Sequence, residues 1–215
     1  MNVVIAGAGG FGREVHQYLL DADRGAGRIR IAGFLVDEPD AVVGLAREVG
    51  VLGRIDEVVP AEGDEVIVAV GDPRLRRSMA IRLARRGWRF HTLVHPTAWV
   101  APTAVLGPGA VVCPFAFVGA HARVGPGAAL NTYASVGHDA ALGEWSVLSP
   151  YAVINGAAVL EEAVFLGTHA SVQPGVRVGR ASKVAAGAVV AQDVAPRSLV
   201  AGNPGKARVL FPDLE

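Results

Sequence analysis

The chain has 215 residues, enough for one or two domains, and 51% of them are hydrophobic, which is ample for a buried core. Basic and acidic residues number 20 each, which argues against nucleic-acid binding and against a basic membrane-surface segment. No stretch reaches the roughly 18 apolar residues of a membrane span, and no charged leader precedes a long apolar run. We therefore expect a cytoplasmic protein whose partner is a small molecule or a second copy of itself.

The first residues predict a strand, a glycine-rich turn and a helix. Gly7, Gly9 and Gly12 form a G-x-G-x-x-G pattern after apolar residues 3–6 and before a helix expected over 13–21. Such a turn presents backbone N–H groups and a helix N-terminus to a phosphate. Three interpretations stay open: a nicotinamide dinucleotide site, a mononucleotide site and a purely structural tight turn.

Strands and helices alternate through residues 1–93, where we predict a small Rossmann-like α/β domain. Further strands are expected over 31–36, over 65–70 and near 90–94, with a short irregular segment after the first of these. About four parallel strands are too few for the two halves of a dinucleotide fold. The acidic pair Asp37 and Glu38 also follows the glycines later than a ribose-binding acid normally does. These observations favour a mononucleotide over NAD.

A second helix begins after the third strand of this domain. Asp72 is suited to the N-cap, and Pro73 to the first helical position. Leu75, Met79 and Leu83 are expected to line one face of the helix. The pattern predicts that this face packs on the sheet.

From Val94 onward the sequence repeats every six residues without a break. All 17 hexads begin with Val, Leu or Ile, the fifth position is Ala, Val or Ser, and Gly recurs at the second. This period fits neither an isolated helix nor a hairpin sheet, but it fits a solenoid of short parallel strands joined by tight corners. Three hexads make a coil of 18 residues, so the repeat predicts between five and six coils and, at roughly 4.8 Å each, a column of about 25 Å.

Each hexad position has an expected place in this solenoid. The aliphatic first position points inward, and the fifth is small because space inside the prism is limited. Glycine at the second position is expected to relieve backbone strain near the corner. Cys113, the single cysteine, is interpreted as small filler of the core.

The repeat resembles the hexapeptide-repeat acyltransferases. This resemblance implies a left-handed parallel β-helix over residues 94–215, an exception to the usual crossover hand. The ending DVAPRSLVAGNPGKARV resembles the segment that closes this helix in many of those enzymes. The tail and the α/β domain are expected to cap the open ends of the prism, because unpaired strand edges lie there.

The histidines of the repeat do not predict a metal site. A zinc enzyme of this fold needs three histidines that converge on one point. His121 and His138 fall on the same face in adjacent coils, but His169 falls on another face. His169 instead stands in a column with Tyr133 and Tyr151, which predicts aromatic stacking on the surface. We predict that no metal is bound.

The stretch LNTYASVGHDAALGEWSVLSP gives His138 a distinctive context. Its pattern N-T-x-x-x-x-x-H-[DE]-x-x-x-G-E-[FW]-S closely resembles the UDP-4-amino-sugar N-acetyltransferases and sialic acid O-acetyltransferases of bacteria. That family also begins with a small α/β domain carrying a glycine turn, so the resemblance spans nearly the whole chain. It implies an acetyl-CoA-dependent transferase in which His138 is the general base and Asp139 the carboxylate that increases its basicity.

The resemblance also implies the ligand contacts. The backbone amide of Gly156 would hold the oxyanion, and acetyl-CoA would lie between neighbouring prisms against Val147, Thr168 and Ala186. Asn131 would face the acceptor. The nucleotide part of the sugar would be held by Gly9, Gly10, Phe11, Asp37, Glu38 and Gly71. Several members of the family have a second histidine where this chain has Val147, so its acceptor or acyl preference can differ.

We therefore predict N-acetylation of a UDP-linked or other nucleotide-linked amino sugar, a precursor of a bacterial glycan. A nucleotide diphosphate supplies the anion that a helix N-terminus receives, whereas free sialic acid supplies no phosphate. Prisms with flat faces of small residues pack around a three-fold axis, which predicts a homotrimer. The alternatives are a sialic acid or other sugar O-acetyltransferase, an NAD-linked oxidoreductase with the β-helix as a stalk, and a non-catalytic scaffold that binds a sugar nucleotide.

Overall fold

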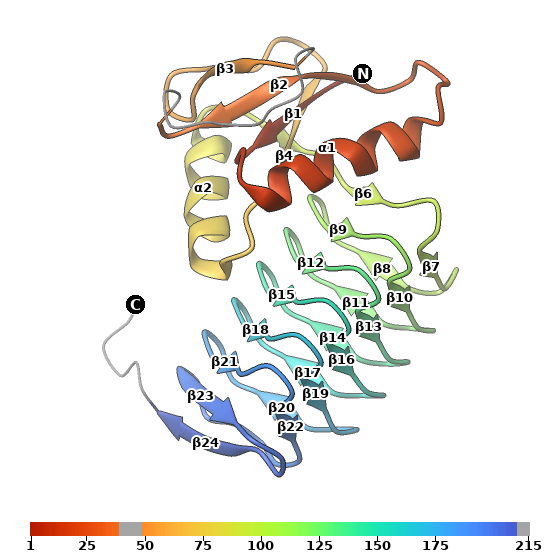
Figure 1. The fold of residues 1–215 in the computed structure, drawn as a ribbon, viewed down its shortest axis with the longest axis vertical. Helices are drawn as coiled ribbons and strands as arrows, with labels where there is room; N and C mark the ends of the chain where they lie inside the picture. The colour runs from red at the N-terminus through yellow and green to blue at the C-terminus, as the bar shows by residue number, and fades with distance from the viewer. Residues whose placement is uncertain (39–48, 210–215) are drawn as a thin grey trace.

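The computed structural model describes residues 1–38 and 49–209, which form a small α/β domain followed by a parallel β-helix (Figure 1). In the described part of the domain, five parallel strands make one sheet in the order β3-β2-β1-β4-β5. This arrangement confirms the predicted Rossmann-like sheet. Its elements are β1 (Asn2–Ala6), α1 (Gly10–Asp23), β2 (Arg30–Val36), β3 (Val51–Arg54), β4 (Asp64–Val68), α2 (Pro73–Arg85) and β5 (Arg89–Phe90).

Two strands differ from the expectation. β3 forms where the sequence predicts an irregular segment, because an edge strand pairs on one side only and its four residues need no continuous apolar run. The single strand expected near 90–94 is two strands. β5 pairs with β4 in the α/β sheet, whereas β6 (Leu93–Val94) pairs with β9 (Val111–Val112) in the β-helix.

Helix α2 begins as predicted, but one of the three residues expected on its buried face is exposed. The carboxylate of Asp72 accepts two backbone N–H groups of the first turn at 3.0 and 3.1 Å. Met79 and Leu83 are buried, but Leu75 is 47% exposed, and the position that joins the buried stripe is Arg76, with no exposed surface. The prediction for Leu75 was wrong because an arginine occupies the inward position.

Arg76 joins the two domains through hydrogen bonds to carbonyl oxygens. Its guanidinium donates to Val68, the last residue of β4, at 2.6 Å, to Val70 just after this strand at 3.1 Å, and to Gly127 of the β-helix at 2.5 Å. Burial lowers the pKa of Arg76 to about 10. The hydrogen bonds to three carbonyl oxygens offset part of the cost of burying this group.

Residues 93–190 form 17 strands of two residues each, and paired strands lie 18 residues apart along the chain. Three strands therefore make one coil, as the hexads predict. The first sheet holds β6, β9, β12 (Ala129–Leu130), β15 (Val147–Leu148), β18 (Phe165–Leu166) and β21 (Lys183–Val184). The second holds β7 (Trp99–Val100), β10 (Phe117–Val118), β13 (Ser135–Val136), β16 (Val153–Ile154), β19 (Ser171–Val172) and β22 (Val189–Val190). The third holds β8 (Val105–Leu106), β11 (Arg123–Val124), β14 (Ala141–Leu142), β17 (Val159–Leu160) and β20 (Arg177–Val178).

The interior of the β-helix follows the predicted pattern. The glycines at the second hexad position, however, are needed for a different reason from the one expected. First-position Leu130 and fifth-position Ala134 are fully buried, as expected. The left-handed backbone falls on the fourth position, where Asp139 has φ of 59°. A Cβ built on second-position Gly137 would lie 2.7 Å from the backbone nitrogen of Gly156 on the next coil. Glycine is needed there because neighbouring coils approach closely, not because φ is positive.

The α/β domain covers the first sheet of the prism rather than its open end. Outward residues Leu93, Val111, Ala129 and Val147 are at most 3% exposed and share a core with α1. Figure 1 shows α1 running across the first coils of this sheet. Val94, which begins the first hexad, stays 37% exposed. We call this first sheet the covered sheet, and the second, which begins with Trp99, the open sheet.

A hairpin follows the last coil, within the segment expected to close the helix. β23 (Ser198–Ala201) pairs in parallel with β21 and antiparallel with β24 (Lys206–Val209). The hairpin therefore extends the covered sheet at the end far from the α/β domain (Figure 1). Neither helix in the described ranges has the length and apolar character needed to cross a bilayer.

Candidate functional site

His138 and Asp139 lie together at the corner between the open sheet and the third sheet. His138 Nδ1 is 2.8 Å from a carboxylate oxygen of Asp139, and the two side chains are 72% and 57% exposed. Neighbouring coils hold the backbone of this corner: Asp139 N–H donates to Ala120, and the carbonyl of His138 accepts from Ala157. With the carboxylate as acceptor, Nδ1 carries the proton, and Nε2 keeps a lone pair that can take another.

Gly156 occupies the same corner one coil further on, against the imidazole of His138. A Cβ built on Gly156 would lie 2.5 Å from His138 Nε2 and 2.6 Å from Cε1. The ring can occupy this place only because residue 156 has no side chain. Among the described residues, the Gly156 N–H has no hydrogen-bond acceptor. A proton acceptor and a backbone donor therefore lie side by side.

Three other predicted contacts lie on a different corner. Asn131 follows β12, Thr168 follows β18 and Ala186 follows β21, so all three stand between the covered sheet and the open sheet. Thr168 and Ala186 are exposed and lie on adjacent coils. The strands of the open sheet separate this edge from His138. Within one chain, the predicted base and these contacts do not converge.

The structure places Val147 apart from both corners. It is the outward residue of β15 in the covered sheet, and its side chain is only 3% exposed. It packs in the core shared with the α/β domain. The side chain of Val147 therefore cannot reach a ligand on the surface of this chain in the described arrangement.

The glycine turn divides into structural and accessible positions. A Cβ on Gly12 would overlap the carbonyl oxygen of Gly7, and Gly7 itself has φ of +107°. Gly9, Gly10 and Gly71 have open space where a Cβ would stand. The first two begin α1, whose first turn has no acidic residue, and Phe11 beside them packs on the interdomain core. Room for a ligand therefore exists at the exposed glycines.

The predicted nucleotide-binding acid Asp37 has a partner that the sequence did not indicate. Its carboxylate accepts from Arg82 of α2 at 2.6 and 3.1 Å. Arg82 also binds Asp56. The carboxylates of Asp56 and Asp37 raise the pKa of the Arg82 guanidinium above its ordinary value. Glu38 is exposed. Arg82 is 45 positions from Asp37, so no local pattern could have revealed the pair.

Comparison with known proteins places this fold in a family. Residues 2–83 match the PglD N-terminal domain. The acetyltransferase domain of PglB from Neisseria gonorrhoeae is 29% identical, with a TM-score of 0.85 over 96% of this chain and 99% of that one. PerB from Caulobacter crescentus, solved with CoA and GDP-perosamine, is 33% identical with a TM-score of 0.85, and 97% of each chain is covered. The chain belongs to the hexapeptide-repeat sugar N-acetyltransferases.

This membership confirms the predicted family, the fold and the enzyme class. A shorter match is the 2,3,4,5-tetrahydropyridine-2,6-dicarboxylate N-acetyltransferase of Staphylococcus aureus, 50% identical over 46 residues. Those residues are 21% of this chain and 19% of the relative, so the chain spans about a fifth of the curated relatives that it matches.

The remaining side chains singled out in this sugar N-acetyltransferase have structural places. Cys113 is fully buried, which raises the pKa of its thiol to about 12 and agrees with a filler of the core. His169 stacks on Tyr151, and Tyr151 on Tyr133, each with ring centroids 4.8 Å apart, as the column predicts. Across residues 1–38 and 49–209, no three His, Cys, Asp or Glu side chains gather closely enough to hold a metal ion.

Proposed function

We propose that this family member transfers the acetyl group of acetyl-CoA to the amino group of a nucleotide-linked amino sugar. The observation that carries the proposal is the imidazole of His138, held by Asp139 on one side and lying against Gly156 on the other. A thioester is electrophilic enough for direct attack by an amine. The enzyme then needs only a base and a donor for the developing oxyanion.

The geometry supports a step in which every proton is accounted for. The sugar nitrogen attacks the thioester carbon while His138 Nε2 takes a proton from that nitrogen. The negative charge on the tetrahedral oxygen is stabilised by the Gly156 N–H. When the carbon–sulfur bond breaks, the imidazolium of His138 returns its proton to the CoA thiolate, and the amide product leaves.

Replacement of His138 tests the base. His138→Ala should lower kcat by roughly two to four orders of magnitude while the affinity for acetyl-CoA stays nearly constant. His121→Ala is the matched control, because it removes an exposed histidine from the same corner one coil earlier. If His138→Ala keeps more than about a tenth of the wild-type rate, another group is the base.

Two observations support a nucleotide diphosphate in the acceptor. PerB was solved with GDP-perosamine, and in this chain Gly9 and Gly10 leave open space at a helix start without acidic residues. Backbone N–H groups and the helix dipole favour an anion there. We expect UDP to be the nucleotide.

Calorimetry with UDP, GDP and TDP tests this assignment. Heat of binding that is present in the wild type and lost in Gly10→Val supports it, because a valine side chain fills the open space. The absence of heat with all three diphosphates at millimolar concentration would overturn it and leave O-acetylation of a free sugar as the alternative. Gly50→Ala is the control, since Gly50 also has open space but lies outside the proposed site.

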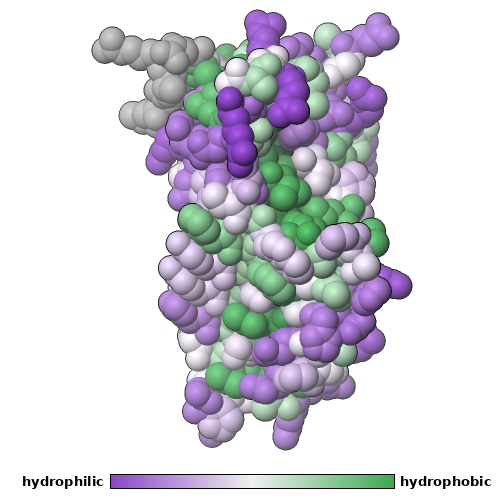
Figure 2. All heavy atoms as spheres, turned by 90° about the vertical axis from the view of Figure 1, so that its right-hand side faces the viewer, coloured by the Kyte–Doolittle hydropathy of each residue, from purple (hydrophilic) through white to green (hydrophobic). Residues whose placement is uncertain are grey.

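We further propose a homotrimer in which neighbouring chains complete one site. His138 and Gly156 stand on one edge of the open sheet, and Thr168 and Ala186 on the other. Between them the open sheet exposes apolar side chains: Trp99 and Phe117 are stacked at 4.8 Å and 52% and 42% exposed. Figure 2 shows a hydrophobic strip running down the solenoid on the side where Figure 1 places this sheet. A second copy on this face would bring opposite edges together.

Mixing two inactive variants tests the shared site. His138→Ala and Thr168→Arg damage opposite edges, so co-refolded chains should regain up to about a quarter of wild-type activity, the fraction of interfaces that pair two intact edges at random. Chains refolded separately and then assayed together without exchange are the control. No recovery in mixed assemblies, or a fully active monomer in light scattering, would contradict the shared site.

A further inference from the structure

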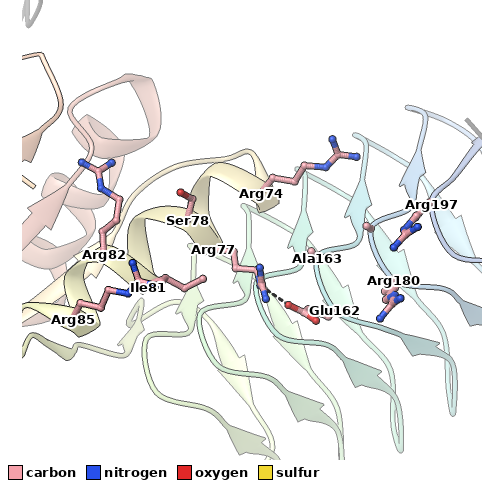
Figure 3. Close-up of a pocket in the computed structure, with 11 residues that line it drawn as sticks. Arg74, Arg77, Ser78, Ile81, Arg82, Arg85, Glu162, Ala163, Arg180 and Arg197 are labelled. Atoms are coloured by element: carbon pink, nitrogen blue, oxygen red, sulfur yellow. Dashed lines mark ion pairs between the residues drawn. The ribbon is translucent and has the colours of Figure 1, made fainter. Parts of the chain in front are cut away.

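A basic groove of about 670 Å³ separates α2 from the side of the β-helix, away from the proposed acetyl-transfer site. Figure 3 shows the side chains of this arginine groove. The arginines that define it are Arg74, Arg77, Arg82, Arg85, Arg180 and Arg197. They are six of the 18 arginines in a chain whose formal net charge is zero. The positive charge of the groove is therefore a local concentration of arginines, because the protein as a whole is not basic.

The groove lies on a different corner of the prism from His138. Its α2 residues share one helix face, and its β-helix residues stand where the third sheet meets the covered sheet. Arg180 follows β20, and Arg197 precedes β23. His138 stands where the third sheet meets the open sheet, and Gly9 and Gly10 are not among the residues that line the groove.

Carboxylates neutralise only part of this charge. Glu162 is the one acidic residue in the lining, and it forms a 2.6 Å ion pair with Arg77 across the groove (Figure 3). Arg82 is held by two aspartates of the α/β domain. Within residues 1–38 and 49–209, Arg85 and Arg180 form no ion pair.

Two arginines on successive coils bring like charges together. The backbone N–H of Arg197 donates to the carbonyl of Arg180 at 2.8 Å, which fixes their main chains side by side. Both side chains line the groove (Figure 3). The positive charge of Arg85 and Arg180, which no described carboxylate pairs, attracts an anion into the groove. Guanidinium forks match the oxygen geometry of phosphate.

We propose that the arginine groove is a second ligand site, which binds the diphosphate of a nucleotide. Its apolar lining, formed by Ile81, Ala163 and Ala181, gives a surface for the base and ribose next to the cations. The volume of the groove is in the range of sites for molecules of this size. The diphosphate has two sources, a free nucleoside diphosphate and the diphosphate of CoA.

Calorimetry on the full chain tests the site, with inorganic pyrophosphate, ADP and CoA as ligands. Pyrophosphate and ADP should bind the wild type, with an affinity that falls as salt is raised. The double variant Arg180→Gln and Arg197→Gln should weaken binding at least tenfold. Arg30→Gln with Arg123→Gln is the matched control, because it removes the same charge at exposed positions outside the groove and should change affinity less than twofold.

Competition between ADP and acetyl-CoA shows which of the two sources supplies the diphosphate. If the site takes a free nucleotide, ADP still binds at saturating acetyl-CoA to the Gly10→Val variant, in which the proposed acceptor site is blocked, and the double variant removes this binding. If it takes the diphosphate of CoA, acetyl-CoA displaces ADP from the wild type, and the double variant binds CoA at least tenfold more weakly. The proposal fails if pyrophosphate and ADP give no heat at millimolar concentration, or if the groove variant and the control are equal. None of these outcomes depends on acetyl transfer, so the proposed function is tested separately.

Discussion

Replacing Gly156 with alanine should displace the imidazole of His138 without unfolding the β-helix. The added Cβ would lie 2.5 Å from Nε2, whereas ordinary contact begins at 3.4 Å, so the ring must move by about 0.9 Å. A misplacement of about 1 Å costs on the order of 100-fold in rate, or about 2.7 kcal/mol of transition-state free energy. Stability should stay nearly constant, because His138 is 72% exposed and its ring can rotate into solvent.

The assay is steady-state release of CoA thiol with an amino-sugar acceptor, together with urea unfolding. A double-mutant cycle identifies the cause of the loss: in the His138→Ala background, Gly156→Ala should change the rate less than about twofold, because the ring that it displaces is gone. Gly50→Ala controls for a glycine-to-alanine change at an open position. Wild-type kcat/KM in Gly156→Ala would show that catalysis does not need the imidazole where the structure places it.

Three further outcomes follow from particular contacts. Asp139→Asn should lower kcat by about ten- to 100-fold with little change in KM, because an amide that donates to Nδ1 places the proton on Nε2; unchanged kcat would contradict this orientation. Arg76→Ala should destabilise the fold by about 3–5 kcal/mol in urea unfolding, since three buried carbonyls lose their donor, whereas Arg30→Ala should change it by less than about 0.5 kcal/mol. Cys113 should not react with a disulfide reagent at pH 8 until the protein unfolds, because burial raises its thiol pKa to about 12, and rapid labelling of the native chain would refute this.

The β-helix could be predicted closely because the hydrophobicity and size of the residues within one hexad determine where each side chain points. Val136 faces the interior and Ala140 fits the limited space there for reasons that six residues contain. The sequence could not show whether the second-position glycines are needed for a positive φ or for close approach between coils. The constraint on Gly137 comes from the backbone of Ile154, Asn155 and Gly156 on the next coil, so it appears only when successive coils are stacked.

The site was harder to predict than the fold because its parts depend on long-range placement. The pairing of His138 with Asp139 joins adjacent residues, and a motif can indicate it. The burial of Val147 depends on where the α/β domain rests, which no local pattern records. Arg76 looks like a surface residue of an amphipathic helix until the carbonyl of Gly127 is placed beside it.

The 18-residue spacing between paired strands also limits how the gene can change length. Inserting one hexad between His138 and Gly156 would preserve every inward aliphatic residue, yet it would turn all later residues by one face of the prism. Gly156 would then stand at a different corner from His138. The protein would keep its apolar core and fold, but it would be inactive. Insertions of a whole coil elsewhere keep each corner in register. Duplication in steps of 18 residues is therefore the route by which such a chain can lengthen and remain an enzyme.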